Sequence, residues 1–441
     1  MDMYIVEWRD KDGELVGKSK PVTKSKGLKW VNGASRQNPE WTYSLNAVEV
    51  VNITSNTSDY KIYGRHLIDL NAIKQMDLAN SLHITAKSAL MPDAHVGYGL
   101  PIGGVWGTKS NHVVPYAVGF DIACRMRLSI VERLTDQFTS ESRELRKYLV
   151  NNTRFGKGAS FQSPNNHKVM ESDIWNQLNI LKGLKDTALS QLGSSGSGNH
   201  FVEWGIVEIS NEINALRLPT GKFLGLLSHS GSRGLGHKIA TYYSDLAVKQ
   251  HPELTGTLKN LAWLDMDTQA GQDYWLAMEL CGEYAAANHE VIHNNIIEGV
   301  DKDVITHVEN HHNFAWKETH FGQDMIVHRK GATPAGKGVL GIIPGSMGTS
   351  GVIVSGKGNE HSLNSASHGA GRVLGRTQAK SKLNKEEWEA YMKYMDITVI
   401  GGDLDESPDA YKNIHHVMAE QTDLVNIEGY FQPKIVRMAG D

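Results

Sequence analysis

Helical and strand-like patterns follow one another irregularly along this chain. Helical periodicity is found at residues 67–85, 141–193, 274–300 and 384–395. Short apolar runs with β-branched residues, typical of strands, are found at residues 221–233, 324–331, 339–346, 351–356 and 396–402. A doubly wound parallel sheet requires a regular succession of strand and helix. We therefore expect an α+β fold, a single catalytic domain of mixed sheets with peripheral helices.

Individual residues mark the ends of three predicted helices. Gly193 and Gly299 stand where glycine commonly ends a helix. Asn384 suits the N-cap of the helix at 384–395, and Glu387 occupies the capping-box position three residues later. These signals predict the boundaries of the helices independently of their periodicity.

Residues 1–58 differ in composition from the rest of the chain. They contain a basic stretch, KSKPVTKSKGLKW, and lead into a polar run, NITSNTSDY, which is typical of a turn-rich connection. The chain has no fixed-period repeat. We predict an N-terminal extension of unknown role over residues 1–58 and one continuous catalytic domain over residues 59–441.

Composition narrows the class of protein. The chain has 441 residues, 40% of them hydrophobic and 21% charged, which indicates a folded globular protein. Its 45 Lys and Arg residues against 49 Asp and Glu residues exclude a globally basic nucleic-acid-binding protein but not a local basic cleft. Because the sequence shows neither a long apolar run nor a secretory signal pattern, we expect a cytoplasmic protein with no membrane partner.

Histidine and cysteine point to metal chemistry. The chain has 20 His residues but only 9 Phe and 2 Cys residues, too few cysteines for a disulfide scaffold. Asp121 and Cys124 form a D-x-x-C pair, and a carboxylate and a thiolate can both bind a divalent ion, while a thiolate can bridge two. The alternative is a turn carboxylate and a buried cysteine.

Further candidate ligands follow glycine-rich or apolar segments. Asn199, His200 and Glu203 come after GSSGSG, where backbone N–H groups can turn towards a phosphate; the alternative is a surface loop. His229 ends an apolar strand. A cluster of four histidines, of which we expect at least two to be plain surface residues, comprises His307, His311, His312 and His320.

Several cations are candidates for phosphate contacts. Arg233 suits bidentate binding, four residues after His229. Arg329 and Lys330 precede a glycine and suit a polyphosphate or an RNA backbone, with a solvated turn as the alternative. The turn PGSMGT adds the hydroxyls of Ser346 and Thr349.

The segment HGAGR suggests a nucleophile. His368 stands among small residues that leave room for a large substrate, and Arg372 and Arg376 follow to neutralise phosphate. Metal ligands, phosphate-binding loops and a nucleophilic histidine together indicate metal-assisted phosphoryl or nucleotidyl transfer.

Eight motifs carry a resemblance to a known family. They are, in order, PDAHVGYGLPIGGV, VGFDIAC, GSGNHFVE, SHSGSRGLGH, HHN, HRKGAT, PGSMGT and SHGAGR. This series resembles the RtcB family of GTP-dependent, manganese-dependent RNA-splicing ligases, over roughly residues 60–441. The resemblance implies an RNA ligase that uses GTP and two Mn²⁺ ions.

The resemblance also assigns residues. The Mn²⁺ ligands it implies, with the Cys124 sulfur bridging the ions, are Asp121, Cys124, His200, His229 and His312. His312 is preferred to His311 because the family's ligand directly precedes an asparagine. His368 is the implied acceptor of GMP. The nucleotide-binding residues expected are Asn199, Glu203, Ser346, Gly369, Gly371, Arg372 and Tyr411, and Arg233, Arg329 and Lys330 are expected to face phosphates.

The implied reaction has three chemical steps. His368 attacks the α-phosphorus of GTP and pyrophosphate leaves. The 3′-phosphate of an RNA then takes the GMP, and the 5′-hydroxyl of a second RNA end displaces it. Where the first end is a 2′,3′-cyclic phosphate, water opens it beforehand.

The sequence departs from the family pattern at two positions that matter. Arg125 stands where many members have glycine, so we expect a cation that crowds or reshapes the metal site. Ala439 stands where many members have a lysine that contacts the guanylate, and Lys434 or Arg437 is the expected substitute.

Two other functions stay open. A dinuclear metal phosphohydrolase acting on RNA phosphate ends would use the same metal site, and a non-catalytic paralogue that binds RNA ends would explain Ala439. The resemblance also suggests an activator of the archease type.

Overall fold

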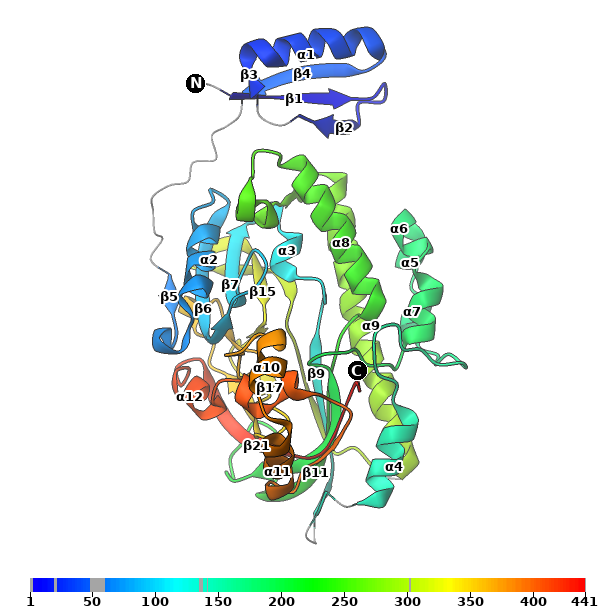
Figure 1. Ribbon diagram of the computed structural model, residues 1–441, viewed down its shortest axis with the longest axis vertical. Helices are drawn as coiled ribbons and strands as arrows, with labels where there is room; N and C mark the ends of the chain where they lie inside the picture. Colours follow the sequence, from blue (N-terminus) through cyan, green and yellow to red (C-terminus); the bar gives the residue numbers. More distant parts are fainter. Residues whose placement is uncertain are drawn as a thin grey trace.

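A computed structural model describes residues 3–19, 22–47, 60–134, 138–140, 142–300 and 303–440. Helices and mixed sheets occur together, so the predicted α+β class is confirmed (Figure 1). None of the described helices combines the length and the apolar character needed to cross a membrane.

Residues 3–47 form a small unit, here called the N-terminal module. It contains β1 (Met3–Arg9), β2 (Leu15–Lys18), β3 (Val22–Thr23), α1 (Lys24–Gln37) and β4 (Thr42–Ala47). All strand pairs are antiparallel: β1 pairs with β4 along one edge and with β2 and β3 along the other. The predicted boundary at residue 58 lies outside the described residues.

An eight-stranded sheet forms the centre of the remaining chain. Its order is β13-β9-β11-β10-β21-β18-β17, and β20 pairs with β21 in the one parallel pairing of this sheet. The bounds are β9 (Arg125–Arg133), β10 (Phe201–Ile209), β11 (Gly221–Ser230), β13 (Thr306–His311), β17 (Leu340–Ile343), β18 (Gly351–Gly356), β20 (Thr398–Ile400) and β21 (Val425–Met438). Gly205 allows the close packing of β21, because an added Cβ would lie 2.5 Å from the ring of Phe431.

A five-stranded sheet packs against the central one. Its order is β14-β15-β7-β6-β5, with β5 (Lys61–Ile62), β6 (Thr85–His95), β7 (Ile102–Lys109), β14 (Phe314–His320) and β15 (Gln323–Lys330). Met91, Val105 and Val327 of this sheet share one buried cluster with Val352 and Val354 of β18. This apolar layer fixes the end of β6 relative to the central sheet, and residues at that end take part in the site described below.

Long helices cover the other side of the central sheet. α9 (Gln269–Val300) packs on β9 and β11, and α8 (Arg233–Gln250) packs on α9. The helix predicted at 274–300 is confirmed, but its predicted end at Gly299 is wrong because the helix continues to Val300. Gly299 serves packing instead, since an added Cβ would lie 2.3 Å from the ring of Tyr148 on α4 (Arg143–Asn152).

The region 141–193 is less helical than its pattern predicts. It contains α4, the 3-10 turn Lys168–Glu171, α5 (Ile174–Gln177), α6 (Asn179–Lys182) and α7 (Lys185–Gln191). Between α4 and α5 the chain turns at Gly156 and Gly158, whose φ angles of 112° and 77° are incompatible with a helix. Gly193 follows α7 with a φ of 83°, as a glycine after a helix end often does.

The remaining helices and strands are short. They are α2 (Leu70–Asn80), α3 (Pro115–Val118), α10 (Arg376–Lys382), α11 (Lys385–Tyr394), α12 (Ile414–Ala419), β8 (His112–Val113), β12 (Leu264–Asp265), β16 (Ala332–Pro334) and β19 (Ser365–Ser367). The predicted N-cap of α11 is confirmed, because the Asn384 side chain accepts hydrogen bonds from the backbone N–H groups of Glu386 and Glu387.

Candidate active site

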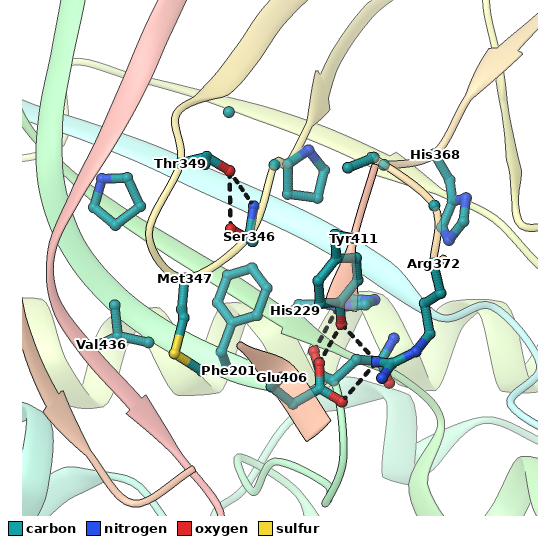
Figure 2. A pocket seen from close by; sticks show the side chains of 18 of the residues that line it. Phe201, His229, Ser346, Met347, Thr349, His368, Arg372, Glu406, Tyr411 and Val436 are labelled. Atoms are coloured by element: carbon teal, nitrogen blue, oxygen red, sulfur yellow. Dashed lines mark hydrogen bonds and ion pairs between the residues drawn. The ribbon is translucent and has the colours of Figure 1, made fainter. Parts of the chain in front are cut away.

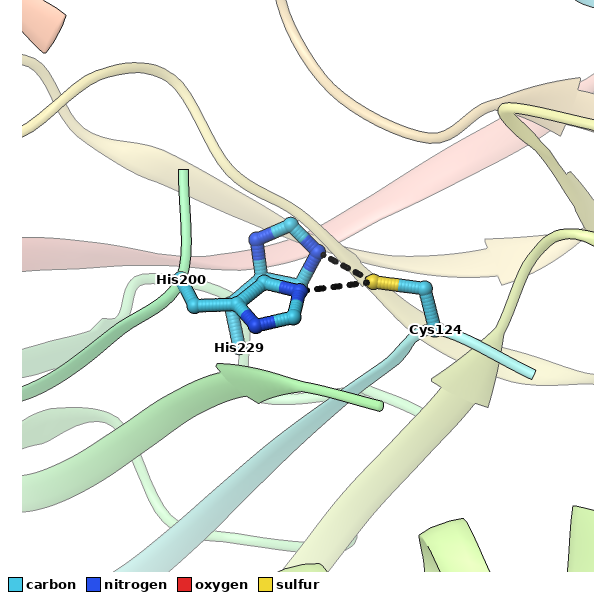
Figure 3. A group of neighbouring side chains, drawn as sticks. All are labelled: Cys124, His200 and His229. Atoms are coloured by element: carbon cyan, nitrogen blue, oxygen red, sulfur yellow. Dashed lines mark hydrogen bonds between the residues drawn. The ribbon is translucent and has the colours of Figure 1, made fainter. Parts of the chain in front are cut away.

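Five predicted ligands meet where β10 begins and β11 and β13 end. The Cys124 sulfur lies 3.0 Å from His229 Nε2 and 3.5 Å from His200 Nε2 (Figure 3). His200 Nε2 lies 2.9 Å from Asp121 Oδ2, and His229 Nε2 lies 3.4 Å from His312 Nε2. Cys124, His200, His229 and His312 are buried, so the chain brings a sulfur, a carboxylate and three imidazoles into one interior space.

The donor set fits a divalent metal better than it fits a hydrogen-bond network. His229 Nδ1 lies 3.0 Å from the backbone carbonyl of Asn199, which assigns its proton to Nδ1 and leaves Nε2 as a bare acceptor. The bare Nε2 atom of His229 faces the Cys124 sulfur and the His312 Nε2 atom, and both are of a kind that binds metals. A cation at this point would satisfy all of them at once.

Burial sets the protonation of these groups. It lowers the pKa of His229 to about 3, so that the ring is neutral and able to bind a cation. Burial, with the nearby charge of Asp121, raises the pKa of the Cys124 thiol well above its ordinary value. Burial also raises the pKa of Asp121, but the charge and hydrogen bond of His200 bring it below the ordinary value. Metal binding would therefore release the thiol proton.

Arg125 does not lie among the metal ligands. Its guanidinium pairs with Glu309 at 2.8 Å, and Arg127 pairs with the other oxygen of the same carboxylate at 2.6 Å. The expectation that Arg125 crowds the metal site is therefore wrong, because Glu309 on the neighbouring strand β13 neutralises it.

His368 is held by a buried carboxylate. Its Nδ1 lies 2.7 Å from Asp93 Oδ2, and the same oxygen accepts from the backbone N–H groups of His368 and Gly369 at 3.2 and 3.4 Å. Burial raises the pKa of Asp93, yet the hydrogen bond and charge of His368, with the charge of Lys412, hold it below its ordinary value. The centroids of the His368 and His312 rings lie 4.8 Å apart. The candidate nucleophile therefore adjoins the candidate metal ligands.

A cavity of about 290 Å³ opens beside His368 (Figure 2). The predicted residues that line it are Asn199, Glu203, Ser346, His368, Gly369, Gly371, Arg372 and Tyr411. These come from β10, from the turn after β17 and from the segments that follow β19 and precede α12. The geometry thus places the predicted nucleotide residues and the predicted nucleophile around one space.

Glu203 provides an unusual carboxyl group inside this cavity. It lies on β10 opposite Val436 of β21, and burial raises its pKa well above the ordinary value. Thr349 orients Ser346. The Thr349 hydroxyl lies 2.9 Å from the Ser346 hydroxyl and accepts a hydrogen bond from the backbone N–H group of Ser346.

Arg372 and Tyr411 are linked through a carboxylate that sequence reasoning missed. Arg372 stacks on the Tyr411 ring at 4.9 Å and donates to its hydroxyl at 3.0 Å and to Glu406 at 3.3 Å (Figure 2). The Tyr411 hydroxyl also donates to Glu406, and Arg376 pairs with Glu406 and with Asp405. Glu406 lies outside the motif series, and its spacing from HGAGR gave no signal.

Asp93 was missed for a different reason. It lies within the motif PDAHVGYGLPIGGV, but it is separated by 275 residues from His368. The nearby sequence gives no sign of which side chain it orients. An aspartate near the end of an apolar strand, just before a glycine-rich turn, is the one sequence signal that marks it.

Two predicted phosphate contacts are not supported. Arg329 is 1% exposed, and its guanidinium pairs with both oxygens of Glu318 at 2.6 and 2.9 Å. Lys330 is 8% exposed and donates to the backbone carbonyls of Tyr98 and Tyr116. Neither lines the cavity, because both side chains bond to partners within the fold. Arg233 binds Ser194 and the carbonyl of Gly156, next to the loop that carries His200.

The histidine cluster also differs from expectation. Of its four members only His307 is exposed, so the prediction of at least two plain surface histidines is wrong. His320 is buried and lies 2.6 Å from Glu318, and His311 packs against Phe314 and Trp316.

The expected substitutes for the C-terminal lysine point elsewhere. Lys434 pairs with Asp396 at 3.1 Å, and Arg437 donates to the carbonyls of Leu149 and Val150. Val436 and Met438 line the cavity instead. Since successive strand residues face opposite sides, Arg437 faces away from the cavity, and this end of the cavity is apolar.

Comparisons with known proteins identify relatives of this chain. A family model described as tRNA-splicing ligase RtcB matches residues 74–438. The chain is 32% identical over 404 residues to the RNA-splicing ligase RtcB of Escherichia coli K12, covering 85% of this chain and 96% of that protein. It is 31% identical over 421 residues to the tRNA-splicing ligase RtcB of Archaeoglobus fulgidus, covering 78% and 86%. The RNA-splicing ligase RtcB of Mycobacterium tuberculosis is 31% identical over 415 residues, covering 76% and 92%.

Proposed function

Because this chain belongs to the RtcB family and is an RNA ligase, we propose that it joins RNA ends through a GMP-linked histidine, with His368 as the nucleophile. The ends joined are a 3′-phosphate, or a 2′,3′-cyclic phosphate, and a 5′-hydroxyl. The observation that carries the proposal is the contact of His368 with Asp93 at the wall of a nucleotide-sized cavity, beside the cluster of metal ligands.

Asp93 prepares His368 for attack. Because the carboxylate accepts a hydrogen bond from Nδ1, the proton resides there and Nε2 carries a free lone pair. Nε2 attacks the α-phosphorus of GTP, a phosphorus–nitrogen bond forms, and pyrophosphate leaves with the electrons of the broken phosphorus–oxygen bond. Asp93 stabilises the positive charge that the ring acquires.

Asp121, Cys124, His200, His229 and His312 would hold two Mn²⁺ ions. When bound, these ions would neutralise phosphate oxygens and favour ionisation of an attacking hydroxyl group. The His312 ring lies beside that of His368, so the candidate ligands stand next to the candidate nucleophile.

The later steps regenerate the imidazole. An oxygen of the RNA 3′-phosphate attacks the phosphorus attached to Nε2, so the phosphorus–nitrogen bond breaks and the RNA end carries GMP through a pyrophosphate linkage. The 5′-hydroxyl then attacks the RNA phosphorus and GMP leaves. A cyclic phosphate is opened by water before these steps.

The cavity favours guanine through Glu203. Guanine presents two adjacent N–H donors on its Watson–Crick edge, and a buried carboxyl group can accept both when ionised. Arg372, held between Tyr411 and Glu406, supplies a fixed cation on the same cavity wall for the phosphates.

The decisive experiment follows the adduct and the joined product together. The protein is incubated with α-labelled GTP and Mn²⁺, and RNAs with matched 3′-phosphate and 5′-hydroxyl ends are then added. We expect a labelled protein that is discharged by RNA, and no label on the His368→Ala variant, while His361→Ala, a change at an exposed histidine, keeps it.

Other outcomes identify the alternatives. Loss of terminal phosphate without GTP and without joining would indicate a phosphohydrolase. Tight binding of 3′-phosphorylated RNA with no adduct would indicate an end-binding protein. The proposal includes a cytoplasmic location, from the sequence pattern, and an archease-type activator, from the family resemblance.

A further inference from the structure

The N-terminal module lies outside the region that the family model matches, which begins at residue 74. One side of its helix α1 is fixed to the sheet of the module. Gly27 is the buried residue of this helix, and an added Cβ there would lie 2.4 Å from Leu45 Cδ1. Trp30 packs 5.0 Å from Trp8 on β1. The apolar side of α1 is therefore partly covered within the module, while Leu28 and Trp30 stay 47% and 43% exposed.

The charged residues of α1 are all basic. The helix sequence KSKGLKWVNGASRQ contains four basic residues and no acidic one. Lys26, Lys29 and Arg36 are exposed, and their spacing of three and seven residues places them along one stripe of the helix with Gly33. At 1.5 Å per residue this basic stripe is about 15 Å long.

Gly33 distinguishes this basic stripe from an ordinary row of solvated lysines, because it exposes the helix backbone. A Cβ added at this residue would meet nothing within 4 Å, so packing does not explain the glycine. In a helix interior glycine costs about 1 kcal/mol relative to alanine. The missing side chain leaves the backbone of α1 open to close approach by a ligand between Lys29 and Arg36.

Most acidic residues of the module lie away from α1, apart from Glu40 in the turn that follows the helix. The acidic residues Asp10, Asp12 and Glu14 lie in the turn between β1 and β2, and Glu7 pairs with Lys18 at 3.0 Å. Figure 1 shows α1 on the side of the sheet that faces away from the catalytic part, whereas β2 lies next to α8. The basic stripe therefore faces outward, without a carboxylate on its own helix.

We propose that Lys26, Lys29 and Arg36 form a docking surface for the phosphate backbone of RNA, which holds the body of a substrate whose ends react at His368. The inference rests on the proposed function for its ligand, because an RNA ligase binds a polyanion. Cations in a row bind phosphates with release of counterions and without regard to sequence. An anionic membrane fits less well, since an interfacial helix needs a broad free apolar face, and α1 offers only the exposed parts of Leu28 and Trp30.

The test uses the full chain with Lys26, Lys29 and Arg36 all changed to Gln, which keeps helix propensity. The control changes Lys74, Lys222 and Lys393, three exposed lysines elsewhere, to Gln. Each phosphate contact contributes about 0.7–0.9 to the slope of log affinity against log salt concentration. We expect binding of a long hairpin RNA to weaken about ten-fold in the stripe variant and the slope to fall by about 2 to 3.

The catalytic site supplies an internal reference. Formation of the GMP adduct, and joining of short oligonucleotides that cannot reach the module, should be unchanged in both variants. A third variant, Lys26→Arg, Lys29→Arg and Arg36→Lys, keeps the charge and should bind long RNA as the wild type does.

Three results would overturn the docking surface. They are equal affinity and salt slope in the stripe and wild-type proteins, equal weakening in the control, or a loss confined to binding of anionic lipid vesicles. Absence of the adduct in the wild type would count against the proposed function instead, and a charge-dependent loss of RNA binding would still support the docking surface.

Discussion

The Nδ1 atom of His368 lies 2.7 Å from Oδ2 of Asp93, and the same oxygen also accepts from two backbone N–H groups. This arrangement fixes both the ring plane and the tautomer of the candidate nucleophile. Lys412 supports Asp93 from the other side. It donates hydrogen bonds to the backbone carbonyls of Pro92 and Ala94 and so places a cation beside the Asp93 carboxylate. The tautomer and the orientation of the His368 ring are thus set from the end of β6.

Asp93→Asn should slow formation of the GMP adduct by about 100-fold or more, because an amide donor at this position favours the wrong imidazole tautomer. The fold should persist, since the side chains are nearly the same size. The measurement is the rate of labelling by GTP at saturating Mn²⁺. Asp267→Asn, at an exposed position, serves as control, and an Asp93→Asn protein labelled at the wild-type rate would refute the positioning role.

Cys124→Ala should reduce bound Mn²⁺ from about two ions to one or fewer per chain, because the proposed site would lose its one thiolate ligand. Adduct formation and joining should be lost with the metal. Elemental analysis after dialysis against Mn²⁺ provides the measurement. Cys281, the other cysteine, is buried in α9 and does not belong to the group formed by Cys124, His200 and His229, so Cys281→Ala should keep its metal even if it is less stable. Full metal content in Cys124→Ala would exclude the bridge.

Glu203→Gln should stabilise the protein while weakening GTP binding. Burial raises the pKa of Glu203, so the native state holds a proton that the unfolded chain releases once the pH exceeds the ordinary carboxyl pKa. The free energy of unfolding therefore falls as pH rises from about 4.5, and glutamine removes that dependence.

The expected gain for Glu203→Gln near neutral pH is about 1–3 kcal/mol, with at least about ten-fold weaker GTP binding. Urea unfolding across pH and calorimetric titration with GTP measure the two effects. Glu208→Gln, an exposed change on the same strand, should alter neither. Unchanged GTP affinity in Glu203→Gln would remove this residue from the guanine site.

Lys330 should make the protein more stable as pH rises above neutrality. Burial lowers the pKa of Lys330 to about 7, so between about pH 7 and pH 10 the unfolded chain binds a proton that the native state lacks. The free energy of unfolding then rises with pH by about 1.4 kcal/mol per unit.

The difference between wild type and Lys330→Met isolates this contribution. Urea unfolding at several pH values above 7 should show a steeper rise for the wild type, and Lys337→Met, an exposed change, should follow the wild type. Parallel curves for wild type and Lys330→Met would show that the lysine keeps its ordinary pKa.

Local signals were predictable from sequence. The N-cap of α11 depends on Asn384 and the next three residues, so its sequence sufficed. The motif series likewise contained many of the residues that line the cavity, because several motifs lie at strand ends, whereas Glu406, Val436 and Met438 lie outside the series. The prediction of mainly helix over residues 141–193 was wrong, because the helical periodicity there does not reveal that the chain turns at Gly156 and Gly158.

The roles of several charged residues depend on partners that are distant in the sequence. Arg329 precedes Lys330 and Gly331 as a phosphate-binding cation would, but Glu318 on the adjacent strand β14 takes both of its charged donors. Asp93 and Glu406 matter through residues that only the fold brings to them. The identity of a charged residue's partner is a property of strand pairing, and no pattern near Arg329 encodes it.

The position of β21 has a consequence for synthesis of the protein. This strand lies between β10 and β18 and contributes Val436 and Met438 to the cavity. While the ribosome has not yet released it, β10 and β18 each present an open edge, which favours pairing with other nascent chains. The cavity also lacks the wall formed by Val436 and Met438 at that stage, so a ligand that needs this wall can stabilise the fold only after β21 has joined the sheet.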